Sequence, residues 1–276
     1  MDVAGVEIDL DTAIFHFSLA LGAAVAYFVF RRAGAKPAAA ARDSLAPLRD
    51  SMAPPALPSP EQLGTLIRGR RSVFPKDYTG EAVPRDVIER ALEAASWAPT
   101  HGKTEPWRFT VFYGADAVAR WHQLKLDGMR ASMSGDELDA ALTKAERKKK
   151  ELKNVAAIIS LGVKRVASSK GKLQPEWEEI ASMGCAVQNL HLSLEAEGYH
   201  GYWSSGGVNG WAECDGTRAV LGLENAVDGQ YVLKDGTPVK ENDRVLGFFF
   251  VGCKRTDANY RMKREPVAEK TTWIEA

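Results

Sequence analysis

Apolar positions recur with two different periods along the chain from residue 61 onward. Spacings of three and four residues predict helices over residues 61–71, 84–98, 116–153 and 175–198. Runs rich in aromatic and β-branched residues predict strands over residues 107–113, 155–163, 199–207 and 245–253. Four strands interleaved with long helices indicate an α+β domain.

Two shorter stretches add detail to this pattern. Residues 213–243 contain two Asp-Gly pairs, which begin at Asp228 and Asp235, and apolar residues flank the second pair. This arrangement predicts a small β-hairpin excursion. Residues 271–274 are apolar and β-branched and predict a strand that crosses to a second copy of the chain.

The first sixty residues have a different character. Residues 13–30 carry no formal charge, and a helix of that length measures about 27 Å against a hydrocarbon core of about 30 Å. Basic residues follow it, which predicts a single-pass membrane anchor with its C-terminal side in the cytosol or an equivalent compartment. The alternative is a buried or partner-packed N-terminal helix. Residues 33–60 are rich in alanine and proline and predict a linker, so we expect segments 1–32, 33–60 and 61–276.

Charge and cysteine content exclude several classes of protein. Thirty-six basic residues balance 36 acidic ones, so nucleic acid is not an expected partner. Cys185, Cys214 and Cys253 lack the spacing of a disulfide framework, and we expect reduced thiols that act as small buried hydrophobes. The five histidines show no metal-ligand spacing, so we expect no metal site.

Residues 98–106 form a predicted corner between a helix and a strand. Pro99 ends the helical pattern because proline disfavours the α conformation of the residue before it. His101 and Glu105 lie in the polar loop that follows, and loops held between rigid elements often carry binding groups. The alternative is an ordinary helix-to-strand connection.

Two basic stretches are candidates for anion binding. Arg70, Arg71 and Ser72 offer two guanidinium groups and a hydroxyl, which suit a phosphate, although such a triplet is also common on protein surfaces. The basic run at residues 144–150 favours a solvated helix face. Contact with an anionic membrane surface or with a nucleotide phosphate is the alternative interpretation.

Taken together, these motifs resemble the nitroreductase family of flavin enzymes, and most closely its compact bacterial branch. That branch has an early R-R-S, then A-P-x-H-x-x-x-Q-P-W entering a strand, G-C-A-V on a helix, a G-x-W-x-S turn and an L-G-F strand. The corresponding residues here are 70–72, 98–107, 184–187, 201–205 and 246–248, in the same order.

The resemblance implies an α+β fold with an antiparallel-rich central sheet flanked by helices. It also implies a homodimer with FMN bound at the subunit interface and NAD(P)H as the electron donor. The cofactor-binding residues that it implies are Arg70, Arg71, Ser72, His101, Glu105, Trp203, Ser204 and Ser205. Residues 193–198 match a segment associated with the nicotinamide donor. No side chain is expected to be catalytic, because the flavin carries the chemistry.

Two positions depart from the family pattern. Glu105 stands where an amide is usual, and an ionised carboxylate can only accept hydrogen bonds from a flavin. Ser204 replaces an arginine. The predicted function is ping-pong reduction of a nitroaromatic, a quinone or a similar small acceptor. Alternatives are reductive dehalogenation or flavin fragmentation on the same fold, or a membrane-tethered adaptor that has lost the flavin.

Overall fold

The computed structural model describes residues 57–166, 173–206, 210–223, 231–232, 238–239 and 243–275. Residues 59–276 form one compact unit. The predicted membrane segment 13–30 and nearly all of the predicted linker lie outside the described residues. Within the described ranges, no helix combines the length and the apolar character that a membrane span requires.

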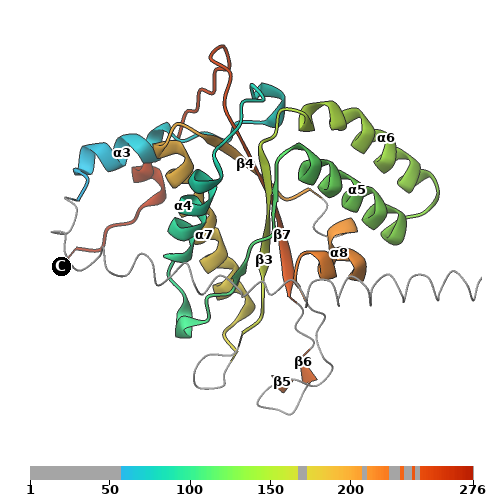
Figure 1. The fold of residues 1–276 in the computed structure, drawn as a ribbon. Coiled ribbons are helices and arrows are strands. Elements are labelled where there is room, and N and C mark those ends of the chain that lie inside the picture. Colours follow the sequence, from blue (N-terminus) through green and yellow to red (C-terminus); the bar gives the residue numbers. More distant parts are fainter. Residues whose placement is uncertain are drawn as a thin grey trace, which may run out of the picture. The chain divides into compact units, whose positions relative to one another are not determined.

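A five-stranded antiparallel sheet forms the centre of the fold (Figure 1). Its strand order is β1 (Trp107–Arg108), β3 (Ala157–Val163), β7 (Arg244–Gly252) and β4 (His200–Ser204), and β2 (Val111–Tyr113) also pairs with β3. The predicted strand 107–113 is therefore two short strands, and both pair with β3. The predicted hairpin is present as β5 (Tyr231–Val232) paired with β6 (Pro238–Val239).

Helices cover both faces of the sheet (Figure 1). Helices α4 (Arg85–Ser96) and α7 (Glu176–Ala196) lie on one face, with α3 (Pro60–Gly69) beside α7. The other face carries α5 (Ala115–Ser132), α6 (Gly135–Leu152) and α8 (Asp215–Val220). Short 3₁₀ turns connect these elements: η1 (Pro75–Asp77), η2 (His101–Lys103), η3 (Trp211–Glu213) and η4 (Val267–Lys270).

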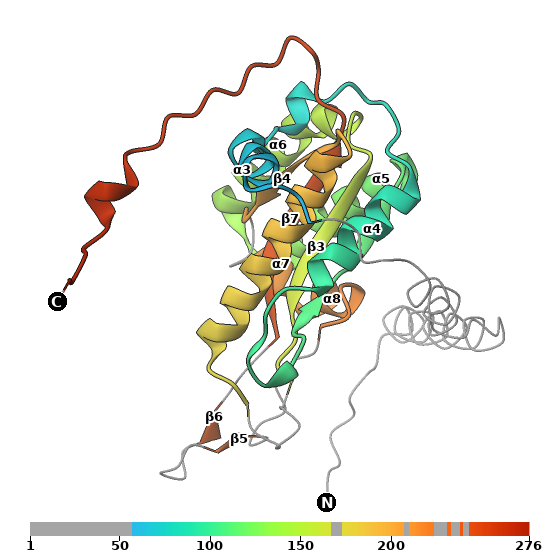
Figure 2. The same cartoon turned by 90° about the vertical axis from the view of Figure 1, so that its left-hand side faces the viewer.

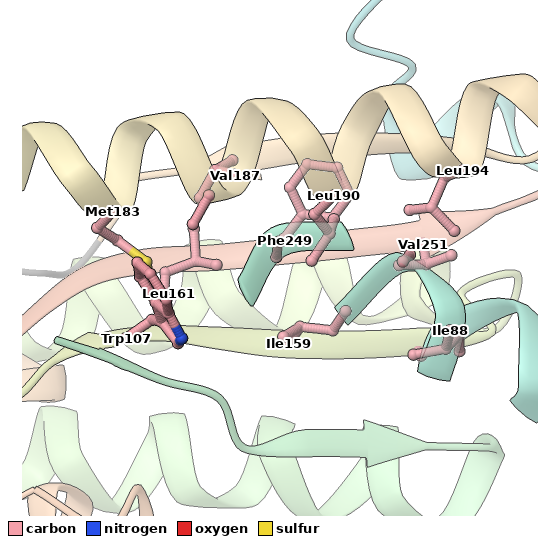
Figure 3. Close-up of a cluster of buried hydrophobic side chains, with 14 of the residues drawn as sticks. Ile88, Trp107, Ile159, Leu161, Met183, Val187, Leu190, Leu194, Phe249 and Val251 are labelled. Atoms are coloured by element: carbon pink, nitrogen blue, oxygen red, sulfur yellow. The ribbon is translucent and has the colours of Figure 1, made fainter. Parts of the chain in front are cut away.

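The central strands are apolar throughout because both of their faces are buried. Phe249 and Val251 of β7 pack with Leu190 of α7 in one core cluster, as Figure 3 shows. Phe248 and Phe250 point to the opposite face and join the cluster beneath α5. Alternate residues of a strand face opposite sides of a sheet, so both faces of β7 are buried. The α+β prediction is confirmed.

Three details differ from the sequence-based expectations. The predicted helix 116–153 is two helices, because Ser134 caps a new helix and Gly135 adopts a φ of 59°. Trp177 and Ile180, whose spacing contributed to the predicted helix 175–198, are exposed, whereas Met183, Val187 and Leu190 further along α7 are buried. Cys185, expected to be buried, is exposed on α7.

The C-terminal tail follows β7 and leaves the sheet (Figure 2). Its apolar side chains are exposed, at 80% for Trp273 and 96% for Ile274. The predicted strand 271–274 has no strand partner among the described residues. Its predicted pairing with a second copy stays a prediction.

Candidate functional site

The corner loop, residues 98–106, exposes His101, Lys103 and Glu105, whereas Thr104 is buried. The Nδ1 atom of His101 lies 2.5 Å from Oε2 of Glu178 in the first turn of α7, so the imidazole donates a hydrogen bond to that carboxylate. Lys103 and Glu105 have φ values of 58° and 44°, and they are the only non-glycine residues with positive φ in the described ranges. Backbone strain of this kind concentrates at functional loops. Both side chains are exposed and accessible to a ligand.

The segment that follows α3 contains Arg70, Arg71 and Ser72 and lies beside the edge strand β4. Ser72 forms a bridge with Gly201, and the Val73 N–H donates to the Gly201 carbonyl at 3.0 Å. The triplet is therefore fixed at the start of β4.

The two arginines of the triplet have different roles. The Arg71 guanidinium donates to four backbone carbonyls, those of Arg68, Gly69, Arg70 and Tyr260, at 2.6–3.2 Å. Arg70 has one described hydrogen bond, from Nη1 to His191 Nδ1 at 3.3 Å. Burial lowers the pKa of Arg70, and the neighbouring Glu195 carboxylate opposes that shift. Arg70 thus keeps donors available for an anion, whereas Arg71 ties the loop to the C-terminal tail.

His191 supports this loop from α7. Burial lowers its pKa from 6.5 to about 4, and the nearby positive charge of Arg70 acts in the same direction. The ring is therefore neutral at pH 7. Its Nε2–H donates to the Arg71 carbonyl at 3.1 Å, which leaves Nδ1 as the acceptor for Arg70. This histidine orients both arginines.

The glycine turn begins where β4 ends. Ser204 pairs with Phe248 of β7, and the Trp203 indole N–H donates to the Leu246 carbonyl at 3.0 Å. Gly247 lies at a bulge in β7 with a φ of 133°, and a Cβ there would lie 2.3 Å from the Ser204 carbonyl oxygen. The L-G-F motif thus needs glycine because two strands approach closely. Ser205 is exposed at the start of the turn.

The eight predicted binding residues form two groups in one subunit. The β4 group comprises Arg70, Arg71, Ser72, Trp203, Ser204 and Ser205, and the corner group comprises His101 and Glu105. The corner precedes β1, at the sheet edge opposite β4, and three strand spacings separate these edges by about 14 Å. Both groups also contact α7: His101 of the corner group meets Glu178, and Arg71 of the β4 group meets His191. These two helix positions are thirteen residues apart, or about 20 Å along the helix axis. The structure therefore does not bring the two groups together within one chain.

A cavity of about 640 Å³ opens beside the β4 group. Tyr202, Ser204 and Gly206 line it on the β4 side, and Phe74, two residues after Ser72, lines it as well. Its floor is aromatic: the Trp211 ring stacks on Phe248 with centroids 5.1 Å apart, and Trp121 packs edge-on against both. Pockets of this size and character suit a planar small molecule.

Similarity to solved structures defines the class of fold. The chain superposes on a nitroreductase-like family protein from Bacillus cereus with a TM-score of 0.59 at 21% identity, covering 80% of this chain and 100% of that one. It also superposes on the FMN-dependent nitroreductase NfnB from Mycobacterium smegmatis, solved with NADPH, with a TM-score of 0.53 at 19% identity, covering 77% and 98%. These likenesses show a nitroreductase-like fold.

Sequence comparison then gives the family. The nitroreductase family model matches residues 67–233, more than half of the chain, and the chain belongs to this family. A Haemophilus influenzae protein assigned as an NAD(P)H nitroreductase is 28% identical over 189 residues, which span 68% of this chain and 86% of that protein. The family predicted from the motifs is confirmed, and with it the class of flavin-dependent NAD(P)H oxidoreductases.

Several residues of the site were missed by reasoning from the sequence. His191 and Glu178 were seen only as parts of a helix, because a helical pattern does not reveal which polar side chain meets which loop. Lys125, which also lines the cavity, was not singled out, although it lies one turn after Trp121 on α5. That spacing was a usable signal for a lysine at the edge of an aromatic cluster.

Proposed function

We propose that the protein is an FMN-dependent NAD(P)H oxidoreductase of the nitroreductase type that reduces a nitroaromatic, a quinone or a similar small acceptor. Family membership supports this proposal. The observation that carries it is the arrangement along β4, where Arg70 and Ser72 lie at the start of the strand and an aromatic cavity opens at its end. This arrangement offers a place for the cofactor's phosphate and, beside it, a cavity for a planar acceptor.

The residues present fit FMN. Arg70 has unused donors and Ser72 an exposed hydroxyl, which suit a phosphate group. Ser204 lines the cavity and would contact the bound cofactor, which leaves the aromatic floor of the cavity to the acceptor. FMN, when bound, supplies the exchange of hydride and electrons. The chain binds and orients it, and Arg71 holds the loop that presents Arg70.

We further propose that the active form is a homodimer. One subunit keeps its corner group and its β4 group on opposite sheet edges, so a single flavin contacted by both groups needs two chains. Exposed apolar side chains offer a surface for such contact: Leu63 and Ile67 on α3, Trp177 on α7, and Trp273 in the tail. Apolar residues left exposed on several elements are typical of an interface.

The test is the flavin content of the purified full-length protein. A yellow preparation that releases FMN on heating is the expected result, and a colourless protein that binds no added FMN would contradict the proposal. Arg70→Ala should weaken FMN binding about ten- to a hundredfold, the magnitude of a charged hydrogen bond of about 1.5–3 kcal/mol. Arg68→Ala, which removes an exposed arginine two residues earlier in the last turn of α3, is the matched control.

We also propose that residues 13–30 anchor the protein to a membrane, with residues 33–60 as a linker and residues 61–276 as the FMN-binding domain on the cytosolic or equivalent side. The uncharged run and the basic residues after it support this proposal. Full-length protein should sediment with membranes and resist alkaline extraction, and a variant that lacks residues 1–58 should not. Full-length protein in the soluble fraction without detergent would contradict the anchor.

A further inference from the structure

The cavity beside β4 has a strongly cationic opening. Four lysines, Lys76, Lys125, Lys144 and Lys148, line it, and we call this set the lysine rim. Glu151 is the one carboxylate among the described lining residues. The whole chain has equal numbers of basic and acidic residues, so this local excess is not a consequence of overall composition.

The lysine rim is not neutralised by neighbouring carboxylates. None of its members forms an ion pair with a described residue, whereas the adjacent Lys149 lies 3.5 Å from Glu146 and is not among the residues that line the cavity. Burial lowers the pKa of Lys125, and the positive charges of Lys148 and Lys144 lower it further. Like charges held together without partners destabilise the fold, and such arrangements are common at functional sites.

The rim and the floor differ in exposure. Lys144 and Lys148 are exposed on α6, one helical turn apart, while Trp121, Trp211 and Phe248 beneath them are buried. Lys125 lies between the two layers, with its ammonium group 5.7 Å from the centre of the Trp121 ring. A molecule that enters from solvent therefore meets positive charge first and aromatic surface next, which favours approach of an anion.

We propose that this cavity binds the electron acceptor and selects aromatic acceptors that carry an acidic group. The lysine rim holds the carboxylate or a similar anion, and the aromatic floor receives the ring. This inference rests on the proposed oxidoreductase function and adds the class of acceptor to it. The basic run at residues 144–150 is then divided: Lys144 and Lys148 belong to the site, and Lys149 belongs to a solvated face.

The test compares two acceptors of the same shape with the FMN-loaded full-length protein. 4-Nitrobenzoate carries the anion, and 4-nitrobenzamide replaces it with a neutral amide. Wild type should show a higher kcat/KM for 4-nitrobenzoate, and this preference should shrink as salt rises. In the Lys144→Gln, Lys148→Gln double variant, kcat/KM for 4-nitrobenzoate should fall about tenfold more than that for 4-nitrobenzamide. Lys149→Gln should keep the wild-type preference.

Binding without turnover separates this inference from the proposed function. Trp121 and Trp211 line the cavity, so 4-nitrobenzoate should quench the tryptophan fluorescence of the oxidised protein, with weaker quenching in the double variant. If neither compound is reduced but this quenching pattern holds, the oxidoreductase proposal fails and the anion site stands. Equal losses for the two compounds would show that the lysines serve the flavin or the fold, and would overturn the inference. So would equal affinity of wild type and double variant for 4-nitrobenzoate.

Discussion

The buried neutral His191 predicts a specific dependence of stability on pH. Its pKa of about 4 lies below the 6.5 of an unperturbed histidine. The unfolded chain therefore binds a proton at this position from pH 6.5 downward, whereas the folded chain binds one only near pH 4. The stability that His191 contributes is complete above pH 6.5 and is lost as the pH falls toward 4. A pKa difference of this size corresponds to roughly 3 kcal/mol of folding free energy.

His191→Gln isolates this contribution. Glutamine retains an N–H that can donate to the Arg71 carbonyl, but it does not titrate. Urea unfolding of the flavin-free protein at pH 7.5 and at pH 4.5 should show wild type losing about 2–3 kcal/mol more than the variant over this interval. Burial raises the pKa of the nearby Glu195, which acts in the opposite direction, but that residue is present in both proteins. Parallel stability profiles for wild type and variant would refute the assignment of a neutral buried His191.

Three further predictions follow from the site. Arg71→Ala should lower the free energy of unfolding by about 2–4 kcal/mol in thermal or urea unfolding, because four backbone carbonyls lose their hydrogen-bond donor. Unchanged stability would contradict the role of Arg71 in tying its loop to the C-terminal tail. Gly247→Ala should weaken flavin binding and destabilise the fold by about 1–3 kcal/mol through its clash with Ser204, whereas Gly184→Ala, where the added Cβ meets nothing within 4 Å, should not. Steady-state kinetics should give parallel reciprocal plots, since the sequence holds no second dinucleotide fingerprint of the G-x-G-x-x-G type after a strand, and intersecting plots would exclude alternating use of one site.

The fold was largely predictable because its main signals are local. The apolar runs of β3 and β7 follow from burial on both faces, and the apolar face of α4 follows from helical spacing. The break between α5 and α6 also had a local signal, since Ser134-Gly135 followed by two acidic residues is typical of a helix start. The sequence-based interpretation gave more weight to the continuous helical pattern on either side than to these cap residues.

The residues of the candidate site could be predicted from motifs, but their arrangement in space could not. Nothing local to His101 shows that it lies on the sheet edge opposite Arg70, because that separation depends on strand order. The lysine rim arises only when α5 and α6 lie side by side, which brings Lys125 close to residues about twenty positions later in the chain. Charge patterns along the sequence cannot distinguish Lys148 from Lys149, although one lines the cavity and the other pairs with Glu146.

The open sheet edge and the unpaired tail are complementary features. β4 is an edge strand, and its outer backbone groups beyond the Ser72 bridge at Gly201 have no strand partner among the described residues. Such an edge favours pairing with another extended segment. Residues 271–275 are exposed and form no strand within their own described chain. A tail that crosses to the second subunit would satisfy both features and would couple dimer formation to the β4 group.

Thr272→Pro tests this coupling. Proline removes the backbone N–H that a paired strand must donate, so it disrupts pairing of the tail without changing the central sheet of its own chain. The expected result is a shift from dimer to monomer in light scattering, together with weaker FMN binding. Thr272→Val keeps the N–H and a β-branched shape, and it should remain a flavin-loaded dimer. A Thr272→Pro protein that stays dimeric and keeps its flavin would show that the tail does not form the interface, because proline cannot donate the backbone hydrogen bond that strand pairing requires.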